Sequence, residues 1–257
     1  MKKSTLLYFV FILFSLPSFS QKKAEALNAA HAKRCITMEV MEEALAKDPS
    51  LRERWKREGE KQYAAWQKRK SLTREAEGVN EIIIPIVFHI VDVDAKQASI
   101  TERDIYEQVE LLNEAYSGKK ADLYKKVIPS EIYNRTGRAN IKFVLAKRTP
   151  AGALTNGIER RVNTSPDHIS VKANTTGGLD AWDVNKYVNV WVGTFAGDDL
   201  DLLGIATFPF TTDEGAQGVV IGTATIPYTS DVDRSYYPAY SEGVTLIHEI
   251  GHYFYLY

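Results

Sequence analysis

The feature that most restricts the possible folds is an almost unbroken apolar run at residues 82–91, Ile-Ile-Ile-Pro-Ile-Val-Phe-His-Ile-Val. Apolar residues at successive positions indicate a β-strand buried on both faces, which is typical of parallel sheets covered on both sides. Pro85 has no amide hydrogen to donate, so it predicts an edge position or a local irregularity in this strand. The run therefore indicates a domain of the α/β class.

The segments that follow predict the rest of this sheet. Thr101 and Asp104 open an amphipathic helix that extends to about Tyr116, and a strand follows it, which is the spacing of a βαβ unit. Residues 149–181 are rich in Gly, Asn, Thr and Ser and predict a loop. Together with residues 82–91, the predicted strands make five: 141–146, 187–192, 204–210 as a short edge strand, and 218–222.

The N-terminal end has the composition of an export signal. Two lysines precede an apolar run at residues 6–14, and small residues follow at 18–20. This order is typical of a signal peptide, here residues 1–20. The alternative is a membrane anchor, but the run is shorter than the roughly 20 apolar residues that span a bilayer. We therefore expect a secreted protein, extracellular or periplasmic, with no membrane contact in its mature form.

Residues 21–78 form a charged segment with helices predicted at 40–46 and 52–70. This segment has 14 Lys and Arg against 10 Asp and Glu, whereas residues 79–257 have 16 against 23. One interpretation is a basic propeptide on an acidic domain, because opposite charges favour docking. The other is a solvated helical face without a task. No basic, aromatic surface indicates nucleic acid, and the net charge of −1 favours no partner.

The strongest chemical signal is the motif H-E-x-x-H, formed by His248, Glu249 and His252. Residues four apart share one face of a helix, so both imidazoles can bind the same metal ion, which this pattern predicts to be zinc. Zinc lowers the pKa of water, and Glu249 is the predicted general base. Ser241 is the predicted N-cap, and an apolar stripe is predicted at Val244, Ile247, Ile250 and Phe254. The alternative is a buried helix with two core histidines.

A catalytic zinc usually has three protein ligands, and the motif supplies two. His89 and His168 are the remaining histidines of the predicted domain. His89 belongs to the buried strand and His168 to a loop, so we expect neither to be the third ligand.

The motif and the segments before it resemble the pappalysin family of metzincin metalloproteases, in its bacterial cytophagalysin- or ulilysin-like branch. The matching segments are 84–89, 141–146, 155–158, 187–192, 203–209 and 218–221, followed by the start of the signature H-E-x-x-H-x-x-G-x-x-H. The resemblance implies a zinc endopeptidase whose N-terminal subdomain covers residues 79–257. That subdomain has a twisted, mostly parallel five-stranded sheet, a backing helix and an active-site helix. It also implies that protein or peptide substrates bind the edge strand by β-augmentation, at Gly204, Ile205, Ala206 and Thr207.

The chain departs from the family pattern at its end. The family's glycine falls on Tyr255, and a bulky residue disfavours the positive φ that this turn requires. The third histidine would follow Tyr257 directly, and the family's C-terminal subdomain would come after it. We therefore expect the N-terminal half of a catalytic domain. The alternatives to an endopeptidase precursor are an inactive truncated remnant and an exported peptide-binding module.

The resemblance also gives a role to Cys35, the single cysteine of the chain. Related bacterial enzymes carry a latency cysteine in the propeptide, so residues 21–78 would inhibit the enzyme through a Cys35 thiolate on the zinc. Arg34 would favour this thiolate. The resemblance leaves calcium open as a second ion. An acidic loop formed by Asp198, Asp199 and Asp201 could bind it, although a solvated turn explains this loop equally well.

Overall fold

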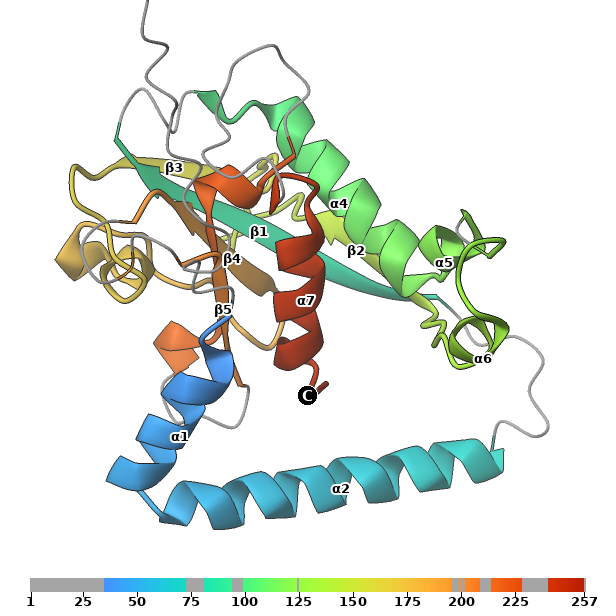
Figure 1. Cartoon of the computed structure of the whole chain (residues 1–257). Helices are drawn as coiled ribbons and strands as arrows, with labels where there is room; N and C mark the ends of the chain where they lie inside the picture. Colours follow the sequence, from blue (N-terminus) through green and yellow to red (C-terminus); the bar gives the residue numbers. More distant parts are fainter. Residues whose placement is uncertain are drawn as a thin grey trace, which may run out of the picture.

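In the computed structural model, the chain folds into a six-stranded sheet with helices packed against it (Figure 1). The structure describes residues 35–72, 81–93, 99–123, 125–195, 199, 202–208, 214–227 and 240–256. The predicted signal peptide and the start of the predicted propeptide lie outside these residues. Within the described part, no helix is long and apolar enough to cross a membrane.

The sheet is built around β1, and its strand order is β2-β1-β4-β6-β5, with β3 also paired to β1. All pairs are parallel except β5 with β6, so β5 forms an antiparallel edge. The mostly parallel sheet and its edge strand are confirmed, with one strand more than the five predicted. The strands are β1 (Ile82–Asp92), β2 (Ile141–Leu145), β3 (Ile158–Val162), β4 (Val188–Gly193), β5 (Gly204–Thr207) and β6 (Gly218–Gly222).

The additional strand, β3, corrects the prediction of a loop over residues 149–181. β2 pairs with the first half of β1, and β3 then pairs with its second half, from Phe88↔Ile158 to Asp92↔Val162. No residue of β3 is fully buried. Its sequence, Ile-Glu-Arg-Arg-Val, carries no apolar run. Periodicity alone therefore could not reveal the strand.

Pro85 lies inside β1, an internal strand, so the edge position that it predicted is wrong for the strand as a whole. The amide of Ile82 and the carbonyl of Ile86 both bond toward the β2 side. The backbone nitrogen of Pro85 therefore faces the opposite side, the side of β4, where pairing begins only at Ile86. The missing amide hydrogen costs no ladder hydrogen bond at this position.

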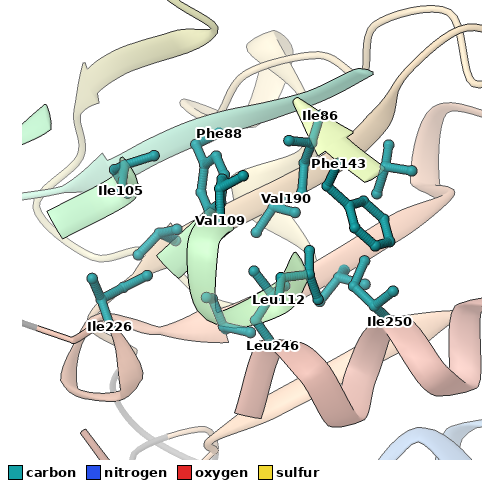
Figure 2. Packing of buried hydrophobic residues seen from close by; sticks show 14 of the residues in the cluster. Ile86, Phe88, Ile105, Val109, Leu112, Phe143, Val190, Ile226, Leu246 and Ile250 are labelled. Carbon is teal, nitrogen blue, oxygen red and sulfur yellow. The ribbon is translucent and has the colours of Figure 1, made fainter. Parts of the chain in front are cut away.

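Two helices cover one face of the sheet, α4 (Glu102–Tyr116) and α7 (Val244–Tyr253). α4 begins directly after Thr101, as predicted, and the structure shows a capping box there: the Asp104 amide donates to Thr101 Oγ1 (3.2 Å) and the Thr101 amide donates to the Asp104 carboxylate (2.8 Å). Figure 2 shows the core that these helices form with the sheet, which includes Ile86, Phe88, Ile105, Val109, Leu112, Phe143, Val190, Leu246 and Ile250. This core fixes α7, which carries the H-E-x-x-H motif, against the sheet.

The opposite face is covered without long helices. Val171, Leu179 and Trp182 come from the segment that contains the 3-10 turns η1 (Ser170–Lys172) and η2 (Asn174–Thr176), and they pack on buried side chains of this face. Two short helices, α5 (Lys119–Leu123) and α6 (Ser130–Tyr133), follow α4. From Ile86 onward β1 is therefore buried on both faces, as its apolar sequence predicts, whereas Ile82 and Ile83 at its start are exposed.

The predicted propeptide contributes α1 (Thr37–Lys47) and α2 (Ser50–Leu72). α1 packs against β5, and α2 extends away from it (Figure 1). The buried side chains of Met41 and Leu45 on α1 contact Phe208, whose ring centre lies 6.0 Å from that of Trp55 on α2. This contact with the domain is apolar, and the electrostatic docking suggested by the opposite net charges stays a prediction.

Candidate metal centre

The H-E-x-x-H motif lies on α7, as predicted, but the helix begins at a different cap. The N-cap is Gly243 with φ +70°, so the prediction of Ser241 is wrong. The Gln108 amide donates to the Gly243 carbonyl (2.9 Å) and ties the start of α7 to α4. The predicted stripe is also shifted, because Val244 is exposed while Leu246, Ile250 and Tyr253 are buried. Packing between α4 and the sheet selects this face.

His248 and His252 lie one helical turn apart with their Nε2 atoms 3.1 Å from each other. His252 Nδ1 lies 2.8 Å from the Leu256 carbonyl oxygen, which can only accept a hydrogen bond. Nδ1 therefore carries the proton, and the Nε2 lone pair faces His248. Burial lowers the pKa of His248, and the neighbouring His252 adds to this effect, which favours the neutral imidazole that a metal binds.

The turn after α7 has the geometry that the sequence put in doubt. Tyr255 adopts φ +66°, its amide donates to the His252 carbonyl, and the Leu256 amide donates to the Gly251 carbonyl, both at 2.9 Å. These two bonds form a Schellman motif with a tyrosine where glycine is usual. A positive φ costs an L-residue roughly 1–2 kcal/mol. Packing beside Phe208, at a ring distance of 6.1 Å, offsets this cost.

Glu249 points away from solvent and toward β5, with an exposed fraction of 0%. Thr37 Oγ1 donates to its Oε2 at 3.0 Å, and Cys35 Sγ lies 3.7 Å from the same oxygen. Burial raises the pKa of Glu249 to about 7, although the hydrogen bonds from Cys35 and Thr37 act in the opposite direction. Its Oε1 atom is buried and has no hydrogen-bond partner among the described residues. A carboxyl group with a pKa near neutrality suits a general base.

Gly204 is required for this approach of Glu249 to β5. A Cβ atom added at Gly204 would lie 2.7 Å from Glu249 Cγ and 2.9 Å from Thr245 Cγ2. Both distances are shorter than real Cβ contacts, so only glycine allows the edge strand to lie this close to α7.

Cys35 meets the two histidines although it lies more than 200 positions before them in the chain. Its Sγ and the ligand nitrogens of His248 and His252 all lie within 4.8 Å of one another, a group that could hold a metal ion. The Cys35 backbone forms a parallel bridge with Gly204. Burial and the charge of Glu249 raise the pKa of the thiol to about 11. Arg34, predicted to favour the thiolate, lies outside the described residues.

The other candidate ligands lie elsewhere. His89 is fully buried, with Nδ1 2.8 Å from Glu159 and Nε2 3.0 Å from Asn189 Oδ1, and its ring stacks on Trp191. His168 Nδ1 lies 2.7 Å from Asp199 Oδ2. Neither belongs to the group around α7, as the sequence predicts. Of the acidic loop, only Asp199 is among the described residues, and Asp198 and Asp201 lie outside them.

A cavity of about 540 Å³ borders the two histidines. It is lined by Tyr116 of α4, by residues 137–139, and by His248, His252 and Leu256. The candidate metal group therefore borders a space large enough for part of a ligand.

Two residues of the site were missed by the sequence reasoning. Thr37 contacts the predicted general base, and its only signal in the sequence is its position two residues after Cys35. Phe208 is 1% exposed, and its ring centre lies 6.4 Å from that of His252. It belongs to the predicted edge-strand segment, where an apolar residue has no distinguishing signal.

Solved structures include proteins similar to this chain. No protein-family model and no curated protein matches the chain. Among solved structures, mature mirolysin of Tannerella forsythia in complex with a cleaved peptide is 35% identical, with a TM-score of 0.60 over 68% of this chain and 64% of that chain. A promirolysin mutant of the same organism is 30% identical, with a TM-score of 0.65 over 86% and 68%. Mirolysin in complex with compound 9 is 36% identical, with a TM-score of 0.57 over 68% and 63%.

The fold and the H-E-x-x-H helix define the class of the chain as metzincin. Within this class, the chain belongs to the pappalysin family, as the resemblance of its sequence implied. It spans 64% of the length of the mature mirolysin structure. The proform covers 86% of this chain against 68% for the mature form, which supports the presence of a propeptide.

Proposed function

We propose that this chain is the latent, secreted precursor of a zinc-dependent endopeptidase. The observation that carries the proposal is the convergence of Cys35, His248 and His252 beside the buried Glu249 at the edge strand β5. These groups come from both ends of the chain and meet where an extended peptide could pair with the sheet. The mirolysin complex with a cleaved peptide supports peptide substrates for the family.

The donor set suits zinc. One sulfur and two imidazole nitrogens are its common ligands, and two tetrahedral Zn–N bonds of about 2.0–2.1 Å place the nitrogens about 3.3 Å apart. The 3.1 Å between His248 and His252 fits this requirement. When bound, zinc supplies a Lewis acid and an activated water at neutral pH.

Each protein group has a defined role in the proposed hydrolysis. Leu256 fixes the His252 ring through its carbonyl oxygen, so that Nε2 is available as a ligand. Glu249 takes a proton from the attacking water and passes it to the leaving amine. The free edge of β5 orients the substrate by β-augmentation.

In the latent form, Cys35 takes the ligand position that the water needs. The raised pKa of the free thiol means that the metal, rather than the protein around it, must favour the thiolate. Cleavage after the propeptide would remove α1 and α2 and open both the metal and β5. Export rests on the predicted signal peptide, and calcium in the Asp198–Asp201 loop stays a prediction.

Two measurements test the proposal. The purified chain should bind one equivalent of zinc, and substitution of both His248 and His252 by alanine should abolish binding. Peptidase activity after removal of the propeptide should disappear in Glu249→Gln while zinc content stays the same. Zinc binding with equal activity in both proteins contradicts the mechanism. Peptide binding without zinc or hydrolysis favours the binding module instead, and absence of all three favours an inactive remnant.

A further inference from the structure

Thr37 makes contacts that cysteine-based latency does not require. It is the first residue of α1, but its hydroxyl does not cap its own helix. The side chain is 1% exposed and reaches two distant groups instead. Its Oγ1 donates to Glu249 Oε2 at 3.0 Å and accepts from the Ala206 amide at 2.9 Å. Both hydrogen-bonding functions of the hydroxyl are therefore used at the candidate active site.

The second of these contacts lies on the free edge of β5. The other edge pairs with β6 from Gly204 to Thr207. Backbone groups of a strand alternate in direction, so residues 204 and 206 present theirs to the same side. Cys35 bridges Gly204, and Thr37 takes the Ala206 amide through its side chain. These two residues thus occupy consecutive positions of the edge that an extended peptide would use.

We infer that Thr37 is a second lock of the latent state, which binds Glu249 and the Ala206 amide while Cys35 occupies a ligand position of the metal site. This inference rests on the proposed function for the roles of Glu249 and Cys35. The hydroxyl itself acts without metal, because both of its hydrogen bonds are made to protein groups. Removal of the hydroxyl should loosen α1 from the domain even when the chain contains no zinc.

The test uses Thr37→Val in the full chain, treated with a chelator. Valine keeps the shape but leaves Glu249 and the Ala206 amide without this partner. Two readouts report the opening of α1: hydrogen exchange of the amides in residues 37–47, and alkylation of Cys35, the only thiol. Loss of a hydrogen bond to a charged group should make the exchange of these amides about 10- to 100-fold faster. Alkylation should also become faster.

Two variants serve as controls. Thr37→Ser keeps the hydroxyl and should behave within a few-fold of the original chain. Val40→Thr makes the reverse change at an exposed position of the same helix and should leave both rates unchanged. Unchanged exchange in β1 shows that the Thr37→Val fold is intact.

Addition of zinc separates this inference from the proposed function. If Thr37→Val opens at the original rate without metal, the lock is refuted, whether or not zinc protects Cys35. If Thr37→Val opens faster but zinc protects Cys35 in neither protein, the metal assignment fails and the Thr37 contact stands. Faster opening together with protection by zinc supports both.

Discussion

Gly204 and Gly251 both border the candidate metal centre, yet alanine at these positions should have opposite effects. At Gly204, the new Cβ would lie 2.7 Å from Glu249 Cγ, whereas carbon atoms in contact prefer about 3.5–4.0 Å. Glu249 or β5 must therefore move by close to 1 Å. At Gly251, the nearest atoms lie 3.8 Å away, on Leu256 and Tyr116, which is ordinary van der Waals contact.

These distances predict the sign and size of each change. Gly204→Ala should lower the free energy of unfolding by about 1–3 kcal/mol, the usual range for overpacking. Gly251→Ala replaces a glycine inside α7 and should raise it by up to about 1 kcal/mol. For a domain of this size, 1 kcal/mol shifts Tm by about 2–4 °C. Thermal unfolding of the chelated chain, followed by circular dichroism, measures both shifts.

The pair also tests how Glu249 is placed. In Gly204→Ala, displacement of Glu249 should break its bond to Thr37 and accelerate hydrogen exchange in α1, while Gly251→Ala should leave this exchange unchanged. A Gly204→Ala chain as stable as the original, with α1 still protected, would refute the argument that β5 must approach α7 this closely.

Three further predictions concern other parts of the molecule. Thr101→Ala removes half of the capping box and should cost about 1 kcal/mol in urea unfolding, whereas Thr101→Ser should cost little. Phe208→Ala leaves a cavity under α1 and should destabilise the chain by about 3–5 kcal/mol in the same urea unfolding experiment. The pKa of Asp122 is lowered to about 2, chiefly by its hydrogen bonds from Arg138, so this pair contributes stability above pH about 4 that is lost as pH falls toward 2. The stability difference between the original chain and Asp122→Asn should therefore vanish near pH 2, and a difference that persists there contradicts the pairing.

Local sequence was sufficient for the elements whose signal is self-contained. The apolar run of β1 predicted a strand buried on both faces, and Thr101 with Asp104 predicted the start of α4. The spacing of His248 and His252 predicted that both would face one point. In each case the relevant atoms lie within a few residues of one another, so the periodicity of a helix or strand determines their geometry.

Tertiary structure decided the features that depend on distant partners. β3 is a strand only because β1 supplies its hydrogen bonds, and Tyr255 tolerates a positive φ only because Phe208 and its neighbours pack against it. The meeting of Thr37 with Glu249 joins residues 212 positions apart, and no local pattern encodes it. The sequence by itself determined which chemical groups α7 presents. The packing of α1 against β5 and α7 determined which of those groups are covered, because burial and hydrogen-bond partners are properties of the folded chain.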